Sequence, residues 1–137
     1  MQKIDYQIEN NLDPEEFRQC LIASTLGERR PIDDFERIKM MIDHANLIVT
    51  ARHEGKLVGV SRSLTDFTFT CYCSDLAVDE HFQSLGIGKE LIRQTKLACG
   101  KAVLHLQAAP KAIPYYPKIG MTQYEFCYRL SDINELK

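Results

Sequence analysis

The stretch that decides the fold runs from residue 76 to residue 89 and reads Leu76-Ala77-Val78-Asp79-Glu80-His81-Phe82-Gln83-Ser84-Leu85-Gly86-Ile87-Gly88-Lys89. An apolar strand ends at Val78, and a helix with apolar residues at helical spacing begins at Gly86. The first amides of such a helix have no carbonyl partner inside it, and the two glycines carry no side chain that would keep an anion away. The stretch therefore predicts a strand, loop and helix that bind a phosphate group, with a plain glycine turn as the alternative.

Two familiar phosphate-binding loops do not fit this stretch. A Walker A loop ending at Lys89 needs Gly at position 83 and Ser or Thr at position 90, where the chain has Gln83 and Glu90. A dinucleotide-binding fingerprint starting at Gly86 needs a small residue at position 91, which is Leu91, and an acid that the run 105–107 does not supply. The remaining pattern is Gln-x-x-Gly-x-Gly.

Outward from this stretch, the hydrophobic period predicts a strand, two helices, three strands, a helix, a strand, a short helix and a strand. Strands are predicted at 3–9, 47–53, 57–64, about 67–78, 102–106 and 123–130, and helices from Pro14, from Asp33 or Asp34 to Asn46, at 86–99 and at 113–118. The expected buried stripes are Phe17, Cys20, Leu21 and Ser24; Phe35, Ile38, Met41 and Ile42; and Ile87, Leu91, Thr95 and Ala98. Because the helix 86–99 connects two strands directly, those strands are expected to be parallel, and the sheet to be mixed.

Composition limits the class of protein. The chain has 137 residues, of which 45% are hydrophobic and 26% are charged, with a net charge of -2, so we expect one soluble globular domain over residues 1–137. The sequence has no run of Lys or Arg, so nucleic acid is not expected as a partner. No stretch approaches the ~20 apolar residues of a membrane helix, and residues 1–10 lack the apolar core of a secretory signal. These features predict a cytoplasmic protein without a membrane partner.

The cysteines are odd in number and lie in segments that read as regular structure; they are Cys20, Cys71, Cys73, Cys99 and Cys127. We expect them to be reduced and to act as small hydrophobic residues. A single Cys-x-Cys without a second Cys or His pair is a poor zinc site, so no metal is expected.

Two motifs and the order of elements resemble the GNAT superfamily of acetyl-coenzyme A-dependent N-acetyltransferases. The first motif is Gln83-x-x-Gly86-x-Gly88 after the strand that ends at Val78. The second, residues 115–121, reads Tyr-Tyr-Pro-Lys-Ile-Gly-Met and is similar to the family's late segment Phe-Tyr-x-Lys-x-Gly-Phe. The chain departs from the family at Pro117 and Met121, and it lacks the Asn often found early in the short helix. The resemblance implies an α/β (α+β) GNAT fold, with a mixed, mostly antiparallel sheet, a splayed central pair of strands and flanking helices.

The resemblance also implies a cosubstrate and its contacts. Acetyl-coenzyme A would pair through its pantetheine with the main chain of Leu76, Ala77 and Val78. Its pyrophosphate would lie on the backbone amides of Gln83, Ser84, Leu85, Gly86, Ile87, Gly88 and Lys89. The acetyl group would pass to a primary amine of a small molecule or peptide by direct attack in a ternary complex. The early helices, with Arg29 and Arg30, would line the acceptor side, and the family allows a homodimer.

The catalytic residues implied by the resemblance are Tyr116 and Asp75. A phenol with a pKa near 10 stays protonated at neutral pH, so Tyr116 can donate a proton to the departing thiolate, while Tyr115 is expected to pack. Asp75 is the candidate general base, although it could equally be a structural hydrogen-bond acceptor or bind the amine as an ammonium ion. Tyr72 and Ser74, on the other face of a regular strand, compete for that role, and a bulge would change which face each presents.

Two other classes of function stay open from the sequence. One is a non-catalytic coenzyme A-binding sensor or interaction module, which the same loop would serve. The other is an unrelated α+β domain in which Gly86 and Gly88 form an ordinary turn. His105, between Leu104 and Leu106, is interpreted as a strand residue, and His81 as an exposed loop residue.

Overall fold

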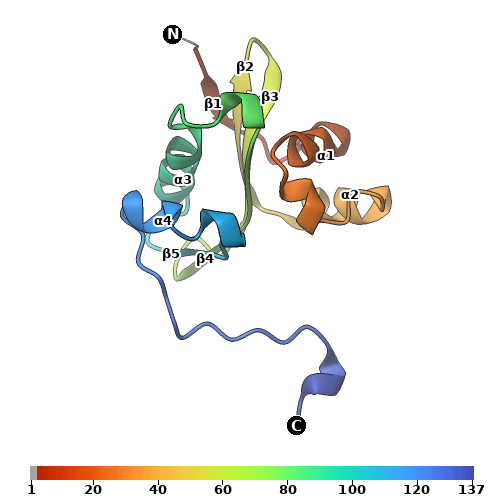
Figure 1. Cartoon of the computed structure of the whole chain (residues 1–137), viewed down its shortest axis with the longest axis vertical. Coiled ribbons are helices and arrows are strands. Elements are labelled where there is room, and N and C mark those ends of the chain that lie inside the picture. The colour runs from red at the N-terminus through yellow and green to blue at the C-terminus, as the bar shows by residue number, and fades with distance from the viewer. Residues whose placement is uncertain (1–2) are drawn as a thin grey trace. The chain divides into compact units, whose positions relative to one another are not determined.

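The computed structural model describes residues 3–137, in two compact units that meet in sequence between Gln107 and Ala108. Met1 and Gln2, part of the N-terminal stretch considered above, lie outside the described residues. The first unit contains β1 (Asp5–Ile8), α1 (Pro14–Ala23), α2 (Phe35–His44), β2 (Leu47–His53), β3 (Lys56–Thr65), β4 (Thr70–Val78), α3 (Ile87–Ala98) and β5 (Val103–Leu106) (Figure 1). Short 3-10 helices cover Leu26–Arg29 and Glu80–Phe82.

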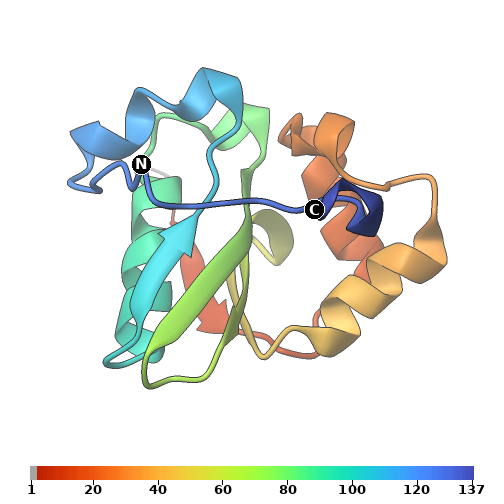
Figure 2. The ribbon, with the colours of Figure 1, turned by 90° about the horizontal axis from the view of Figure 1, so that it is seen from below.

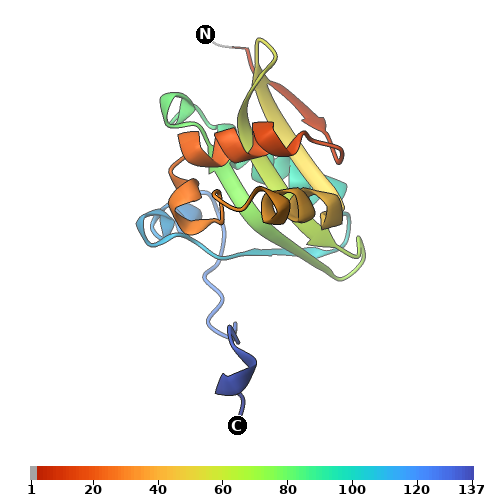
Figure 3. The same ribbon diagram turned by 90° about the vertical axis from the view of Figure 1, so that its right-hand side faces the viewer.

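The sheet of the first unit has the strand order β1-β2-β3-β4-β5. The first four strands are antiparallel neighbours, and β4 and β5 run side by side in the same direction, joined through α3 (Figure 2). Helices α1 and α2 cover one face of the sheet and α3 covers the other (Figures 1 and 3). The mixed, mostly antiparallel sheet predicted from the sequence is confirmed.

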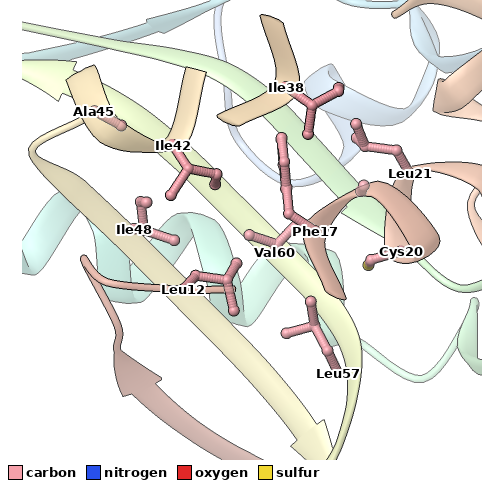
Figure 4. Close-up of a cluster of buried hydrophobic side chains, with 11 residues drawn as sticks. Leu12, Phe17, Cys20, Leu21, Ile38, Ile42, Ala45, Ile48, Leu57 and Val60 are labelled. Carbon is pink, nitrogen blue, oxygen red and sulfur yellow. The ribbon is translucent and has the colours of Figure 1, made fainter. Parts of the chain in front are cut away.

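The core under α1 and α2 follows the predicted stripes. Asp13 caps α1 by accepting a hydrogen bond from the Glu16 amide at 3.2 Å, and Leu12 and Phe17 are buried in one cluster, as a hydrophobic staple requires. The cluster joins both helices to the sheet through Leu12, Phe17, Cys20, Leu21, Ile38, Ile42, Ala45, Ile48, Leu57, Val60 and Ala77 (Figure 4). Phe35 differs from expectation because it is exposed at the first position of α2, so the buried stripe of that helix begins at Ile38.

Helix α3 packs on the opposite face over a glycine. A Cβ atom at Gly59 of β3 would lie 3.1 Å from Ile87 Cγ2 and 3.1 Å from Leu91 Cδ1, closer than side chains normally pack. The helix therefore lies directly against the backbone of β3. Further along α3, Thr95 Oγ1 lies 2.8 Å from Ser61 Oγ, which satisfies two buried hydroxyls.

Strand β4 begins at Thr70 rather than near residue 67. Phe67 has a φ of 62°, which a strand residue does not adopt, and the Asp66 carboxylate accepts from the amides of Thr68, Phe69 and Thr70 at 2.9, 2.8 and 3.0 Å. The aromatic residues that suggested a longer strand therefore lie in a turn. The other hairpin matches expectation, with positive φ at Glu54 and Gly55 between β2 and β3.

The second unit, Ala108–Lys137, contains α4 (Tyr115–Lys118) and short 3-10 helices at Pro110–Ala112 and Ile133–Glu135. The predicted strand at 123–130 is wrong: this segment has no strand conformation, and the side chains of Tyr124, Phe126 and Tyr128 are 59%, 66% and 94% exposed. Alternating apolar residues suggested the strand, but a strand is stable only when neighbours pair with its backbone. The expectation of one domain over residues 1–137 stays a prediction.

One charged cluster joins β1, β2 and α1. The Arg52 guanidinium donates to both oxygens of Glu9, at 2.9 and 3.0 Å, and to Glu16 at 2.8 Å. The hydrogen bonds from Arg52 lower the pKa of Glu9 from 4.5 to about 2. Because the folded protein has the lower pKa, this stabilisation is present above pH 4.5 and is lost as the pH falls through about 2.

We expect Glu9→Gln to lower the free energy of unfolding by about 2 kcal/mol at pH 7, the scale of hydrogen bonds to charged groups. The difference from the wild type should shrink between pH 4.5 and about 2. Urea unfolding at pH 7, 4 and 2.5 measures it. Glu16→Gln is the control, because Glu16 is 42% exposed and should contribute less than about 1 kcal/mol. A pH-independent difference between Glu9→Gln and wild type would contradict this account.

Candidate functional site

The fourth strand extends beyond its parallel neighbour. Strands β4 and β5 pair only from Thr70 to Cys73, opposite Val103 to Leu106, whereas β4 continues to Val78. Within residues 3–107, no strand pairs with the β5-side edge of Leu76, Ala77 and Val78. This is the splayed pair that the family resemblance implied. Backbone groups on such an edge can pair with an extended ligand as another strand would.

A β-bulge at Ser74 precedes the open edge. Arg62 of β3 pairs with Asp75, but the next residue, Ser63, pairs with Cys73, so Ser74 is the extra residue. Cys73 therefore faces α3, with its Sγ 3.4 Å from Ser61 Oγ, while Asp75 faces α1 and α2. Tyr72, on the alternate face from Cys73, shares the face of Asp75, unlike in the regular strand considered above.

The loop after β4 is shaped by its own polar groups. The Asp79 amide donates to the Val58 carbonyl at 2.8 Å, and the Asp79 carboxylate accepts from the His81 amide at 2.9 Å. The Gln83 side chain donates to the Val78 carbonyl at 3.0 Å. The Val78 carbonyl thus has a hydrogen-bond partner within the loop. Because the Gln83 side chain is used in this bond, the predicted contact of Gln83 with an anion would be made by its backbone amide.

The loop turns into α3 through left-handed backbone. Ser84 and Gly86 have φ values of 66° and 83°, and no atom lies within 4 Å of a Cβ built on Gly86. The first amide shown to bond within the helix is that of Glu90, which donates to the Gly86 carbonyl at 3.0 Å. The amides of residues 87–89 therefore form the positive end of a twelve-residue helix. This open backbone suits a pyrophosphate group.

Two features orient this helix start. Ile87 is buried under α3 at 2% exposure, which fixes the first turn against the core, while Leu85 and Lys89 are exposed. Lys89 adds a positive charge beside the free amides. That the backbone amides of Leu85, Ile87 and Lys89 bind a pyrophosphate stays a prediction.

Asp75 lies in a buried cluster that the sequence did not predict. Its carboxylate is 0% exposed, and its two oxygens accept from the Nε atoms of Arg30 and Arg62. Arg30, expected as an acceptor-facing residue, is thus bound to β4. The one signal in the sequence was Arg62, the single charged residue within the predicted strand 57–64, since a charged side chain inside a sheet needs a partner.

Tyr116 belongs to the second unit. It lies in α4, where its carbonyl accepts from the amides of Ile119 and Met121 at 3.2 and 3.0 Å. Its ring meets the Tyr115 ring edge to face, with centroids 5.2 Å apart. Partial burial raises the pKa of Tyr115. The assignment of Tyr116 as the general acid stays a prediction.

Across residues 3–137, no group of three or more His, Cys, Asp or Glu side chains is arranged to hold a metal ion. In the same residues, no helix has both the length and the apolar character needed to cross a membrane. Cys20, Cys71, Cys73 and Cys99 are buried, Cys127 is exposed, and all are free thiols.

A mixed sheet with an open edge on β4, followed by a glycine loop and a helix, is the arrangement of an α/β protein that the GNAT resemblance implied. Residues 23–126 match the family described as the Acetyltransferase (GNAT) domain. The chain belongs to this GNAT acetyltransferase family.

Individual proteins agree with this assignment. An uncharacterized N-acetyltransferase (ycf52) of Porphyra purpurea is 29% identical over 100 residues, which are 67% of this chain and 55% of that protein. The chain thus spans about half the length of the curated relatives it matches. The GNAT-family protein SP0256 of Streptococcus pneumoniae has a TM-score of 0.74 at 20% identity, over 96% of this chain and 98% of its own. The aminoglycoside N-acetyltransferase AAC(6')-Iy in complex with CoA has a TM-score of 0.74 at 14% identity, over 97% of each chain. These two structures show the fold.

Proposed function

We propose that the protein is an N-acetyltransferase that moves an acetyl group from acetyl-coenzyme A to a primary amine of a small molecule or peptide. The observation that carries this proposal is the open edge of β4, which continues through the glycine loop into the free amides at the start of α3. One surface thus offers strand-like pairing for pantetheine and amides for a pyrophosphate. Family membership supports the same function.

The donor would be held chiefly by main chain. Leu76 and Val78 direct their backbone groups to the edge of β4 that β5 leaves, because the Asp79 amide donates to Val58 of β3 and successive residues of a strand alternate between its two edges. Residues 84–89 offer amides at the helix start. The cosubstrate supplies an activated thioester when bound. The chain itself would hold the thioester in one orientation toward the amine. This restriction lowers the entropic part of the activation barrier.

The proton steps need an acid and a neutral amine. Tyr116 is proposed as the acid because its motif position matches the family segment and its phenol is protonated at neutral pH. For Asp75, pairing with two guanidinium groups favours the structural acceptor among the three roles considered, since taking up a proton would break a buried ion pair. The attacking amine would then lose its proton to solvent or to another group.

The cytoplasm is the proposed compartment, because the free thiols of the described chain suit a reducing environment. The acceptor is expected on the side of α1 and α2, since the donor would use the open edge of β4. The aminoglycoside activity of a structural relative makes small polyamines one class worth testing. Peptide N-termini and lysine side chains are the other class.

The test is direct acetyl transfer. We expect the purified protein to release free coenzyme A thiol from acetyl-coenzyme A only when a suitable amine is present, and mass spectrometry should find that amine heavier by one acetyl group. Calorimetric titration with coenzyme A is measured in parallel. Binding without transfer across small amines and peptides would favour the sensor or interaction module. Absence of both binding and transfer would contradict the proposal.

A further inference from the structure

The buried cluster around Asp75 connects three parts of the first unit. Arg30 follows the 3-10 helix Leu26–Arg29 between α1 and α2, Arg62 lies on β3, and Asp75 lies on β4 directly after the bulge. The side chains of Arg30, Arg62 and Asp75 are 22%, 8% and 0% exposed. Arg30 is thus the member of the cluster nearest to solvent, on the side where the acceptor is expected.

Both arginines use their donors in the same way. The Nε atom of each binds a different oxygen of Asp75. The Nη2 atom of each binds Ser74, with Arg30 donating to its carbonyl at 2.9 Å and Arg62 to its hydroxyl at 2.9 Å. The Nη1 atom of each binds a carbonyl of the helical layer, that of Arg29 or that of Met41, both at 2.9 Å. The bulge residue Ser74 is therefore held from two sides.

We propose that Arg30 is a positioning residue that fixes residues 28–31 to the bulge of β4, so that the acceptor side and the donor side of the site keep one relative placement. This inference rests on the proposed function, because it assumes that the open edge of β4 binds the donor. The planar guanidinium matters, since only a fork of donors can bind Asp75 and the Ser74 carbonyl together.

The charges of the Arg30–Asp75–Arg62 cluster decide which of its members can be substituted. Asp75 neutralises only one of the two guanidinium charges, so the cluster keeps an excess positive charge beside Ser74. Removing Arg30 leaves the Asp75–Arg62 pair complete and neutral, so the fold should survive. Removing Asp75 would instead leave both guanidinium groups without a counter-charge, and removing Arg62 would leave the buried carboxylate paired only with the more exposed arginine. Arg30 is therefore the member of the cluster that can be substituted to test positioning.

The test compares Arg30→Gln and Arg30→Lys with Arg18→Gln. Arg18 is the matched control, because its Nε atom binds the Ile32 carbonyl at 2.8 Å, just after this segment, and its other hydrogen bond is to Glu15 of α1. Amide hydrogen exchange is measured first, on the protein without substrates, so this arm does not depend on any enzymatic activity. Arg30→Gln should raise amide exchange about tenfold in both residues 28–30 and residues 74–76, whereas Arg18→Gln should affect only the former segment.

The second arm uses an acceptor identified by the transfer assay. Both Arg30 variants should raise the acceptor KM about tenfold and leave the dissociation constant of coenzyme A within about twofold, whereas a loss of folded protein alone would lower kcat without changing KM. Unchanged exchange in residues 74–76, or full recovery of KM by Arg30→Lys, would overturn the positioning role. If transfer itself is absent in the wild type, the proposed function fails, but the exchange result still decides whether Arg30 couples the segment to β4.

Discussion

Gly88→Glu is expected to raise the dissociation constant of coenzyme A at least about 100-fold, equivalent to ~2.7 kcal/mol. Residue 88 lies in the first turn of α3, where free amides point away from the helix and would meet the pyrophosphate. A carboxylate there would occupy that space and repel the phosphates. The folded protein should not lose stability, because Glu is a better helix former than Gly and its charge suits the helix start. Isothermal titration calorimetry with coenzyme A measures the effect.

Two further variants separate bulk, charge and folding. Gly88→Gln adds nearly the same volume without the charge, so it should weaken binding less than Gly88→Glu does. Gln94→Glu adds the same charge to α3 about 9 Å further along the helix, and its affinity should match that of the wild type. Unchanged affinity in a folded Gly88→Glu protein would show that the helix start does not bind the phosphates.

Tyr116→Phe is expected to lower kcat by about 100- to 10,000-fold, the usual contribution of a general acid, while the affinity for coenzyme A changes little. The substitution removes only the hydroxyl and keeps a ring that can meet Tyr115 edge to face. Single-turnover thiol release at several pH values measures the proton-transfer step. Weaker cosubstrate binding in place of slower transfer would make Tyr116 a binding contact.

The neighbouring Tyr115→Phe variant is the matched control for this prediction. If Tyr115 only packs, its loss of a hydroxyl should leave kcat within about threefold of the wild type. A large loss of kcat in Tyr115→Phe together with normal turnover in Tyr116→Phe would assign the acid to Tyr115. Normal turnover in both variants would leave water as the proton donor.

Most of the fold of the first unit could be predicted because local signals agree with tertiary packing. The helix start at Pro14, the two strands at 47–53 and 57–64, and the stripe beginning at Ile87 each correspond to an element that the structure contains. The strand expected at 123–130 shows where this reasoning ends. Alternation in sequence indicates which face of a strand would be buried, but it does not supply the neighbouring strand that the backbone needs.

The candidate site was predictable only where backbone geometry defines it. Glycines at 86 and 88 indicated the loop and the helix start: Gly86 has a φ of 83°, which few other residues adopt, and Gly88 leaves the first turn of α3 without a side chain. The Arg30–Asp75–Arg62 cluster joins residues 45 and 13 positions apart in sequence, and no local pattern links them. The bulge at Ser74 was equally hidden, because one extra residue leaves composition unchanged while it reverses which side chains share a face.

Gly59 connects the second face of the sheet to the proposed phosphate site at the start of α3. Because α3 rests directly on this glycine through Ile87 and Leu91, the depth of its first turn depends on a residue of β3 that no ligand would touch. A methyl group at position 59 would lie 3.1 Å from Ile87 Cγ2, 3.1 Å from Leu91 Cδ1 and 3.3 Å from Ala51 Cβ, so these neighbours would have to yield by a few tenths of an ångström. If α3 shifts to make this room, the amides that are proposed to bind the phosphates shift with it. If those amides bind the phosphates, substitutions at position 59 would change the affinity for coenzyme A. They would leave the loop sequence and the acceptor side unchanged.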